Sequence, residues 1–285
     1  LTGLAACYLL AWPTPIDPLA YQPPPGPALT GVLAPNTALR AAQHIGAGQL
    51  QGPEDTAADA QGRIYGGTHD GRILRVTPDG RVAVFAETGG RPLGMAFDAQ
   101  GNLIVADAWK GLLSIDPAGQ VTVLATEADG VPFAFTDDLD IASDGAIYFT
   151  DASSRYNQPD YLFDLLEARP HGRLLRYDPA TGEVATLLDG LYFANGVALS
   201  QAEDFVLVNE TYRYRITRYW LKGEKAGRSD VFIDNLPGFP DNISATRDGR
   251  FWLALFTVRN PQMDAMHPRP LVKKIVSRLP RTFWP

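Results

Sequence analysis

Cysteine is almost absent from this chain, since Cys7 is alone among 285 residues. One cysteine cannot form an internal disulfide, so the fold must be stabilised by its hydrophobic core or by a metal. Long runs of like charge are also absent, and the net charge of −7 with a pI near 5.1 argues against a nucleic-acid partner. With 45% apolar residues, the chain is long enough for one large all-β domain or two small ones.

A long hydrophobic run is missing as well. The apolar stretch from Leu1 to Trp12 has about a dozen residues, whereas a membrane-spanning helix needs roughly 20. Because the chain starts at Leu and not at Met, we expect residues 1–12 to be the remnant of an N-terminal membrane anchor or signal segment. The alternative is a lipoprotein cleavage box ending at Cys7, although the residues after Cys7 stay apolar.

Proline and glycine are plentiful, with 23 and 27 residues, as expected of many short strands joined by turns. Prolines gather between residues 13 and 35, including Pro23-Pro24-Pro25. Each proline ring fixes φ and removes a hydrogen-bond donor, so this segment is predicted to be an extended linker. The folded domain is then expected at residues 36–285.

One pattern recurs along that domain. A polar residue precedes a short apolar strand, an Asp-Gly-like turn follows, and further short strands complete the unit. The turn glycines Gly62, Gly101 and Gly145 are 39 and 44 residues apart, and the 104 residues from Gly145 to Gly249 hold two units. Four strands per unit and a period near 40 to 50 residues indicate a β-propeller and not a sandwich.

The predicted fold is therefore an all-β, six-bladed propeller with four-stranded antiparallel blades. Five units are visible and the last is incomplete in this chain, which continues into a segment with helical character after Phe256. An insertion in the third unit, residues 155–170, could form one or two helical turns. It is expected either to cover the channel or to pack between blades.

Polar residues occupy one repeated position in these units. Glu54, Asp137 and Asp241 each precede a turn glycine by eight positions, and Asn195 opens a matching unit. Because the first strand of each blade lines the channel of a propeller, these residues, with Asn242 beside Asp241, are predicted to converge. Three carboxylates and two amides suit calcium before magnesium, and without imidazole or thiolate they exclude a typical zinc site.

The same residues have simpler interpretations. Asn195-Gly196 is a common turn dipeptide, Asp241-Asn242 after Pro240 could be a turn, and Glu54 after Pro53 could be solvated. The equal offsets favour the ring over these readings. Five aspartates beside turn glycines are instead predicted to be structural: Asp59, Asp79, Asp98, Asp144 and Asp248.

Several specific motifs run through the chain from about Gly31 to Leu279. They include Gly90-Arg-Pro-Leu-Gly-Met, Ile147-Tyr-Phe-Thr-Asp, Gly172-Arg-Leu-Leu-Arg-Tyr-Asp-Pro, Pro237-Gly-Phe-Pro-Asp-Asn-Ile and Arg269-Pro-Leu-Val-Lys-Lys. In these motifs the chain resembles the strictosidine synthase-like proteins. This resemblance implies a six-bladed propeller related to paraoxonases, gluconolactonases and the senescence marker protein, with an animal member anchored by one amino-terminal membrane helix.

The resemblance also implies roles for individual residues. The calcium-binding positions of the paraoxonase-type members fall on Glu54, Asp137, Asn195, Asp241 and Asn242. Those enzymes carry Asn where this chain has Asp137, and the added negative charge should either tighten calcium binding or alter what lies above the ion. The acid/base glutamate of plant strictosidine synthases lies in the last blade, which this chain lacks. The resemblance therefore does not assign Pictet-Spengler condensation to this chain. The paraoxonase histidine pair has no equivalent, since His69 and His171 fall in predicted turns.

The resulting hypothesis is a calcium-dependent hydrolase of lactones or aryl esters. The metal would polarise the ester carbonyl while Asp137 deprotonates water, although ligation would depress the basicity of Asp137. Two alternatives stay open: a non-catalytic, membrane-anchored propeller whose structural calcium supports binding of a partner protein or glycan, and a synthase that forms carbon-carbon bonds. The propeller is expected on the non-cytoplasmic side of a membrane, in the periplasm or lumen.

Overall fold

The computed structural model describes residues 3, 8–9 and 12–284. Most of the expected anchor remnant, including Cys7, lies outside the described residues. None of the helices within the described ranges is long and apolar enough to cross a membrane.

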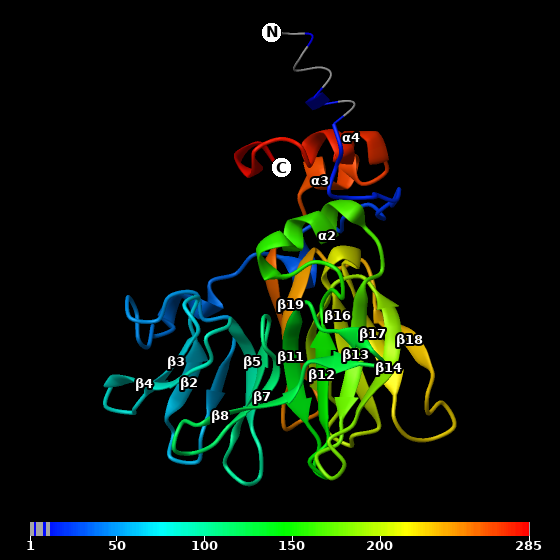
Figure 1. The fold of residues 1–285 in the computed structure, drawn as a ribbon. Helices are drawn as coiled ribbons and strands as arrows, with labels where there is room; N and C mark the ends of the chain where they lie inside the picture. Colours follow the sequence, from blue (N-terminus) through cyan, green and yellow to red (C-terminus); the bar gives the residue numbers. More distant parts are fainter. Residues whose placement is uncertain (1–2, 4–7, 10–11, 285) are drawn as a thin grey trace.

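Four antiparallel sheets of four strands each follow one another along the chain, arranged as blades in Figure 1. In every blade the strands pair in sequence order, so consecutive strands are neighbours. The first two blades comprise β1 (Thr56–Ala58), β2 (Ile64–Gly67), β3 (Arg72–Val76), β4 (Val82–Glu87), β5 (Pro92–Phe97), β6 (Leu103–Asp107), β7 (Gly111–Ile115) and β8 (Val121–Ala125). The next two comprise β11 (Thr136–Ile141), β12 (Ile147–Asp151), β13 (Gly172–Tyr177), β14 (Val184–Leu191), β15 (Ala194–Leu199), β16 (Phe205–Glu210), β17 (Arg215–Trp220) and β18 (Ser229–Ile233).

A fifth sheet has only two strands, β19 (Gly238–Ala245) and β20 (Phe251–Val258). Within residues 12–284, no strand pairs with the outer edge of β20, and Trp252 and Phe256 on this strand are 75% and 68% exposed. A small hairpin, β9 (Glu127–Ala128) and β10 (Val131–Pro132), lies between the second and third blades. The prediction of four-stranded antiparallel blades with an incomplete last one is confirmed.

Helices gather at one end of the propeller (Figure 1). The insertion in the third blade forms η3 (Gln158–Asp160) and α2 (Tyr161–Glu167), so the expected helical turns are confirmed. The segment after β20 forms α3 (Pro261–Met266), α4 (Pro270–Val276) and η5 (Arg281–Phe283). Three further 3-10 turns are η1 (Gly31–Leu33), η2 (Ala38–Ala41) and η4 (Thr211–Arg213).

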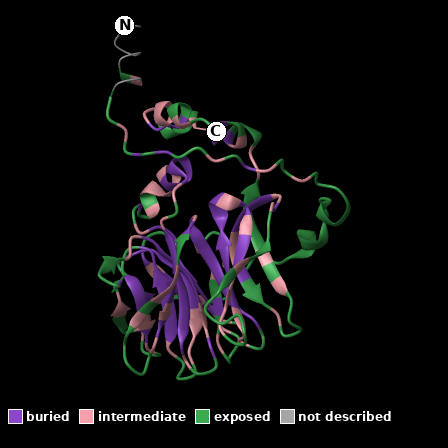
Figure 2. Cartoon of the chain, turned by 90° about the vertical axis from the view of Figure 1, so that its right-hand side faces the viewer, coloured by how far each residue is buried: buried purple, intermediate pink, exposed green. Residues whose placement is uncertain are grey.

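The core lies between neighbouring blades, and the strand period explains why. In β6, Leu103 and Val105 pack in the cluster shared with the first blade, whereas Ile104 and Ala106 pack in the cluster shared with the third. Because successive side chains of a strand point to opposite faces, a strand with a blade packed on each face must be apolar on both, as β6 is from Leu103 to Ala106. Outer strands such as β8 are mostly exposed, which gives the burial gradient of Figure 2.

The turn aspartates are structural, as predicted. Asp59 Oδ1 accepts hydrogen bonds from the backbone N–H groups of Gln61 and Arg63 at 3.0 and 2.9 Å. Asp98 repeats this arrangement with Gln100 and Asn102 at 2.9 and 2.8 Å. These bonds fix the tight turns between the first and second strands of their blades.

Residues 13–25, which we call the strap, are extended as expected of a proline-rich segment but are not a free spacer. Ile16 is buried in the same cluster as Leu165, Leu166 and Met266. The backbone of the strap is tied down by hydrogen bonds from Leu19 N to Glu167 O (2.9 Å), from Tyr21 N to His267 O (3.0 Å) and from Lys273 Nζ to Leu19 O (2.6 Å). The strap therefore joins α2 to the helices α3 and α4.

Candidate functional site

The inner strands share a local irregularity at the predicted site positions. In β11, three residue steps from Thr136 to Leu139 face two steps of β12, so one extra residue is inserted. The same β-bulge occurs in β5 between residues 92 and 95, in β15 between residues 194 and 197, and in β19 between residues 240 and 243. Bulges bend a strand and redirect a side chain, and here they fall at Asp137, Asn195 and Asp241.

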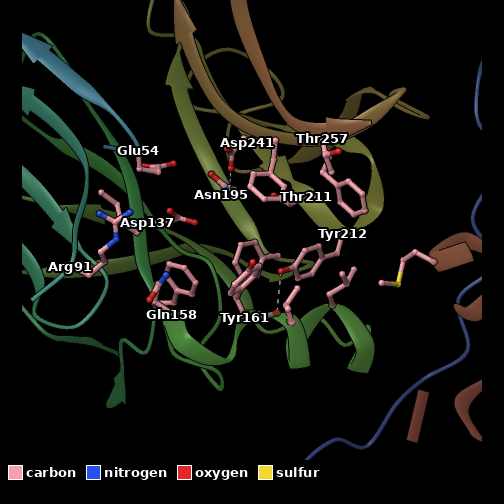
Figure 3. Close-up of a pocket in the computed structure, with 18 of the residues that line it drawn as sticks. Glu54, Arg91, Asp137, Gln158, Tyr161, Asn195, Thr211, Tyr212, Asp241 and Thr257 are labelled. Carbon is pink, nitrogen blue, oxygen red and sulfur yellow. Dashed lines mark hydrogen bonds between the residues drawn. The ribbon is translucent and has the colours of Figure 1, made fainter. Parts of the chain in front are cut away.

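Four of the five predicted metal ligands line one pocket. Glu54, from the loop before β1, lies there with Asp137, Asn195 and Asp241, and their side chains face the same space in Figure 3. We call these four residues the polar end of the pocket. Asn242 does not line it, although its side chain lies beside Glu54.

The polar end holds oxygen atoms that lack protein partners. Glu54 Oε2, Asp137 Oδ2 and Asn195 Oδ1 are all buried and accept no hydrogen bond from the protein. The amide nitrogen of Asn195, Nδ2, donates a hydrogen bond to Asp241 Oδ1 at 2.8 Å. This bond fixes the orientation of the Asn195 amide. Buried polar atoms without partners are costly, so this concentration at one place indicates a ligand site.

Burial and mutual repulsion disfavour ionisation of these carboxyl groups. Burial raises the pKa of Glu54 to about 8, with further contributions from the charges of Asp241 and Asp55. Burial likewise raises the pKa of Asp137 well above its ordinary value, and Glu54 and Asp241 add to the shift. A cation among these groups would oppose both causes.

The donor atoms fit a hard divalent cation such as calcium, since they are carboxylate and amide oxygens only. However, residues 12–284 include no three His, Cys, Asp or Glu side chains already grouped closely enough to hold a metal. Binding would therefore require Glu54, Asp137 and Asp241 to turn toward one another. Glu54 Oε2 and Asp137 Oδ2 have no hydrogen bond that would resist such a movement, whereas Asp241 would keep or exchange its bond from Asn195.

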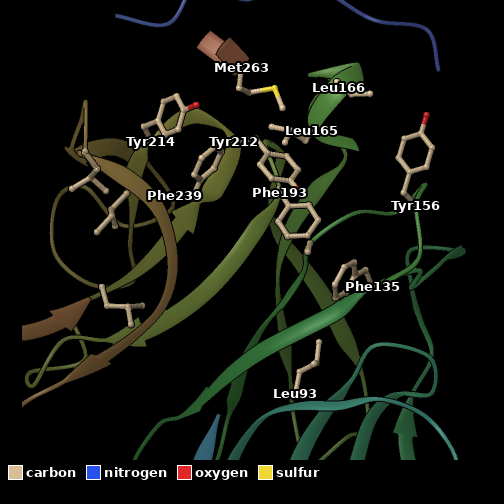
Figure 4. Close-up of a cluster of buried hydrophobic side chains, with 14 of the residues drawn as sticks. Leu93, Phe135, Tyr156, Leu165, Leu166, Phe193, Tyr212, Tyr214, Phe239 and Met263 are labelled. Atoms are coloured by element: carbon tan, nitrogen blue, oxygen red, sulfur yellow. The ribbon is translucent and has the colours of Figure 1, made fainter. Parts of the chain in front are cut away.

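The rest of the pocket is mostly apolar, and the volume of the whole pocket is about 400 Å³. Phe135, Phe193 and Tyr212 form one wall, in which the last two rings stack with centroids 4.4 Å apart (Figure 4). Tyr161 and Leu165 on α2 adjoin this wall, and the hydroxyl of Tyr212 donates to the backbone oxygen of Tyr161 at 3.1 Å. The insertion at residues 155–170 thus covers the pocket, which decides between the two roles expected for it.

Arg91 is a site residue that the repeat pattern did not reveal. Its side chain is 5% exposed and lines the pocket near Glu54 and Asp137, and its Nη2 atom donates to the backbone oxygen of Gly52 at 2.9 Å. Burial lowers the pKa of Arg91, and the nearby carboxylates oppose that change. The motif Gly90-Arg-Pro-Leu-Gly contained Arg91, but no other unit has an arginine at that place.

The two histidines of the sequence argument are separated in the structure. His69 lies in the turn after β2 and lines the pocket at an exposed position, where its ring packs over Gly52. His171 lies outside the pocket, with its Nε2 atom 2.7 Å from Glu167 Oε2. The two rings therefore do not form a pair at the polar end.

Known proteins resemble both the sequence and the fold. The family described as strictosidine synthase matches residues 137–224, and the family described as strictosidine synthase-like, N-terminal, matches residues 31–76. The adipocyte plasma membrane-associated protein of Bos taurus is 41% identical over 298 residues, which cover 97% of this chain and 71% of the bovine protein.

Solved structures with a similar fold are six-bladed β-propellers. A gluconolactonase from Xanthomonas campestris superposes with a TM-score of 0.62 and 26% identity, covering 73% of this chain and 71% of that one. The calcium-binding protein regucalcin from Agrobacterium tumefaciens superposes with a TM-score of 0.58 and 19% identity, covering 72% and 68% of the two chains. The second likeness concerns the fold alone.

Proposed function

The chain belongs to the strictosidine synthase-like family, and we propose that it is a calcium-dependent hydrolase of lactones or aryl esters. The main support is the pocket itself, in which unpartnered carboxylate and amide oxygens face an apolar cavity of about 400 Å³. Such a cavity suits a small, mostly apolar molecule with one polar group to be oriented. A gluconolactonase among the structural relatives supports the choice of ester chemistry.

Glu54, Asp137, Asn195 and Asp241 would hold the calcium, and Asn242 would support Glu54. When bound there, calcium would supply a Lewis acid for the ester carbonyl. The aromatic wall and α2 would exclude bulk water and hold the apolar part of the substrate near the polar end. Arg91 would offset part of the negative charge that the three carboxylates bring together.

Asp137 is the proposed general base. It lines the pocket, and its Oδ2 atom is buried without a partner, so it can accept a proton from a water molecule held in the cavity. Asp137→Asn keeps the shape and an amide oxygen but removes the basic group. We expect turnover to fall at least about 100-fold, as is typical for a lost general base. Full turnover with an unchanged pH profile in Asp137→Asn would reject this role.

The test of the proposed function combines stability with activity. Thermal unfolding of the chain is measured with calcium and with a chelator, beside a panel of lactones and aryl esters. We expect a calcium-dependent rise in unfolding temperature that is lost in Asp241→Ala, together with turnover. A rise without turnover would favour a propeller with structural calcium that binds a partner, and no rise would reject the metal site.

A membrane location is also proposed, with the propeller on the non-cytoplasmic side. It is supported by the apolar residues 1–12 and by relatives whose name describes them as plasma membrane-associated. Protease protection of the propeller in sealed membrane vesicles, before and after permeabilisation, would test the side.

A further inference from the structure

The three helices after β20 form a surface at the end of the propeller where the N-terminal residues lie (Figures 1 and 2). We call residues 261–284 the cap. Leu9 and Trp12 are fastened to it, because Arg278 donates from Nη1 to Leu9 O and from Nε to Trp12 O, both at 2.8 Å. The hydroxyl of Tyr8 in turn donates to Arg278 O at 3.1 Å. Tyr8, Leu9 and Trp12 are therefore held against the cap.

Helix α4 of the cap packs Val276 toward the core, but it leaves two apolar residues exposed and buries a lysine. Leu271 is 61% exposed and Val272 is 37% exposed, whereas Lys273 is fully buried, with its Nζ atom bonded to the strap. A helix on the surface of a protein in water normally does the opposite. Trp12 and Phe283, at 61% and 69% exposure, add large apolar groups to the same end.

The exposed apolar groups elsewhere have a different setting. On β18 and β20, Phe232, Trp252 and Phe256 are exposed beside the unpaired edge of the last sheet. The cap does not lie on a sheet edge, so strand pairing cannot account for its exposed apolar side chains. The exposed apolar side chains of the cap therefore need another explanation, such as contact with an apolar partner.

Charge identifies the kind of partner. The cap holds five cations, Arg269, Lys273, Lys274, Arg278 and Arg281, and one acid, Asp264, so its formal charge is +4. Lys273 is buried against the strap and Arg281 pairs with Asp160 at 2.9 Å, so the other three cations carry the charge of the cap surface. The whole chain is at −7, which leaves −11 for all other residues. Basic side chains among exposed aromatic and aliphatic groups match the boundary of an anionic lipid bilayer, which attracts the cations and accepts the apolar groups.

We propose that the cap rests on an anionic phospholipid bilayer, as a contact additional to the N-terminal stretch. Trp12, Leu271 and Phe283 enter the boundary between headgroups and acyl chains, while Arg269 and Lys274 lie at the headgroups. Met263 and Trp284 of the same cap line the pocket, so this contact sets the pocket beside the membrane. The inference does not depend on hydrolase activity.

The test is partition of the full chain onto vesicles of phosphatidylcholine alone, or of phosphatidylcholine with 30% phosphatidylserine (about a third anionic lipid, enough for a negative surface potential). Arg269→Gln with Lys274→Gln probes charge, and Leu271→Ser with Phe283→Ser probes apolar insertion. Lys222→Gln with Lys225→Gln, in the loop between β17 and β18, and Val84→Ser with Val123→Ser, on outer strands, are matched controls. All variants keep residues 1–12, so differences report on the cap.

We expect the anionic lipid to strengthen wild-type partition, and the double charge variant to lose about fivefold per side chain on anionic vesicles only. The apolar cap variant should weaken partition on both vesicle types, while both control variants match the wild type. Hydrogen exchange of vesicle-bound protein should slow at residues 271–284 and not in the loop between β17 and β18. Equal partition of cap and control variants, with unchanged exchange at residues 271–284, would overturn the proposal.

Discussion

Glu54 should make the stability of the domain depend on both pH and calcium. Its pKa is raised from 4.5 to about 8 by burial and by the charges of Asp241 and Asp55. At 1.36 kcal/mol per pKa unit, ionised Glu54 costs the folded state on the order of 5 kcal/mol when no cation is present. Folding takes up a proton between pH 4.5 and 8, so stability should fall as the pH rises through this window.

The assay is urea unfolding at pH 5, 6, 7 and 8, with either a chelator or millimolar calcium. In chelator, wild-type protein should lose stability toward pH 8, whereas Glu54→Gln should lose several kcal/mol less. Calcium should restore the wild type at pH 8 by roughly 3 kcal/mol if its concentration is about 100 times the dissociation constant, and should restore Glu54→Gln less. Glu183→Gln, at an exposed turn, should behave as the wild type.

Two results would refute this reasoning. Equal stability of the wild type at pH 5 and pH 8 in chelator would mean that Glu54 is solvated enough to ionise freely. A calcium response in Glu54→Gln as large as in the wild type would mean that the ion binds elsewhere.

Three further predictions concern Gly196, Asp164 and Glu167. A Cβ added at Gly196 would lie 2.4 Å from the backbone oxygen of Asp241, so Gly196→Ala should cost about 1–3 kcal/mol and weaken calcium binding. At Gly66 in β2 the only close contact of an added Cβ is the flexible side chain of Leu50 at 3.1 Å, so Gly66→Ala should cost less in the same unfolding assay. Burial raises the pKa of Asp164 to about 7, so stability should fall from pH 4 to 7, and Asp164→Asn should flatten that slope; an unchanged slope would contradict it. Glu167 is fully buried and accepts from the backbone of the strap, so Glu167→Ala should cost about 3 kcal/mol and expose the strap to limited proteolysis, and an intact strap under protease would argue against this contact.

The ring of polar residues was predictable because it is a repeated register. Asp137 and Asp241 precede their turn glycines by the same number of residues, and this spacing also preserves the bulges in β11 and β19. The sequence did not reveal the bulges themselves. Nor did it reveal that Asp241 lines the pocket while Asn242, next to it, does not.

Features that occur once could not be predicted in this way. Arg91 reaches the pocket from a single loop, so no repeat marks it, and only its burial and its position beside Glu54 identify it. The strap presents a similar case. Its prolines predict extension, but composition does not say that Ile16 finds a buried place against α2.

The docked strap changes how a membrane-attached form of this protein would behave mechanically. From Pro13 to Asp55 there are 43 residues. If this segment were a free chain, it could extend to roughly 140 Å, and the propeller could move and rotate freely relative to the membrane. The strap is the first part of this segment. Because it is hydrogen-bonded to α2 and to the helices of the cap, it connects the amino terminus to the domain rigidly and not as a flexible linker. The propeller would then keep one face toward its support, and a pull on the amino terminus would reach the helix that covers the pocket before it reached any blade.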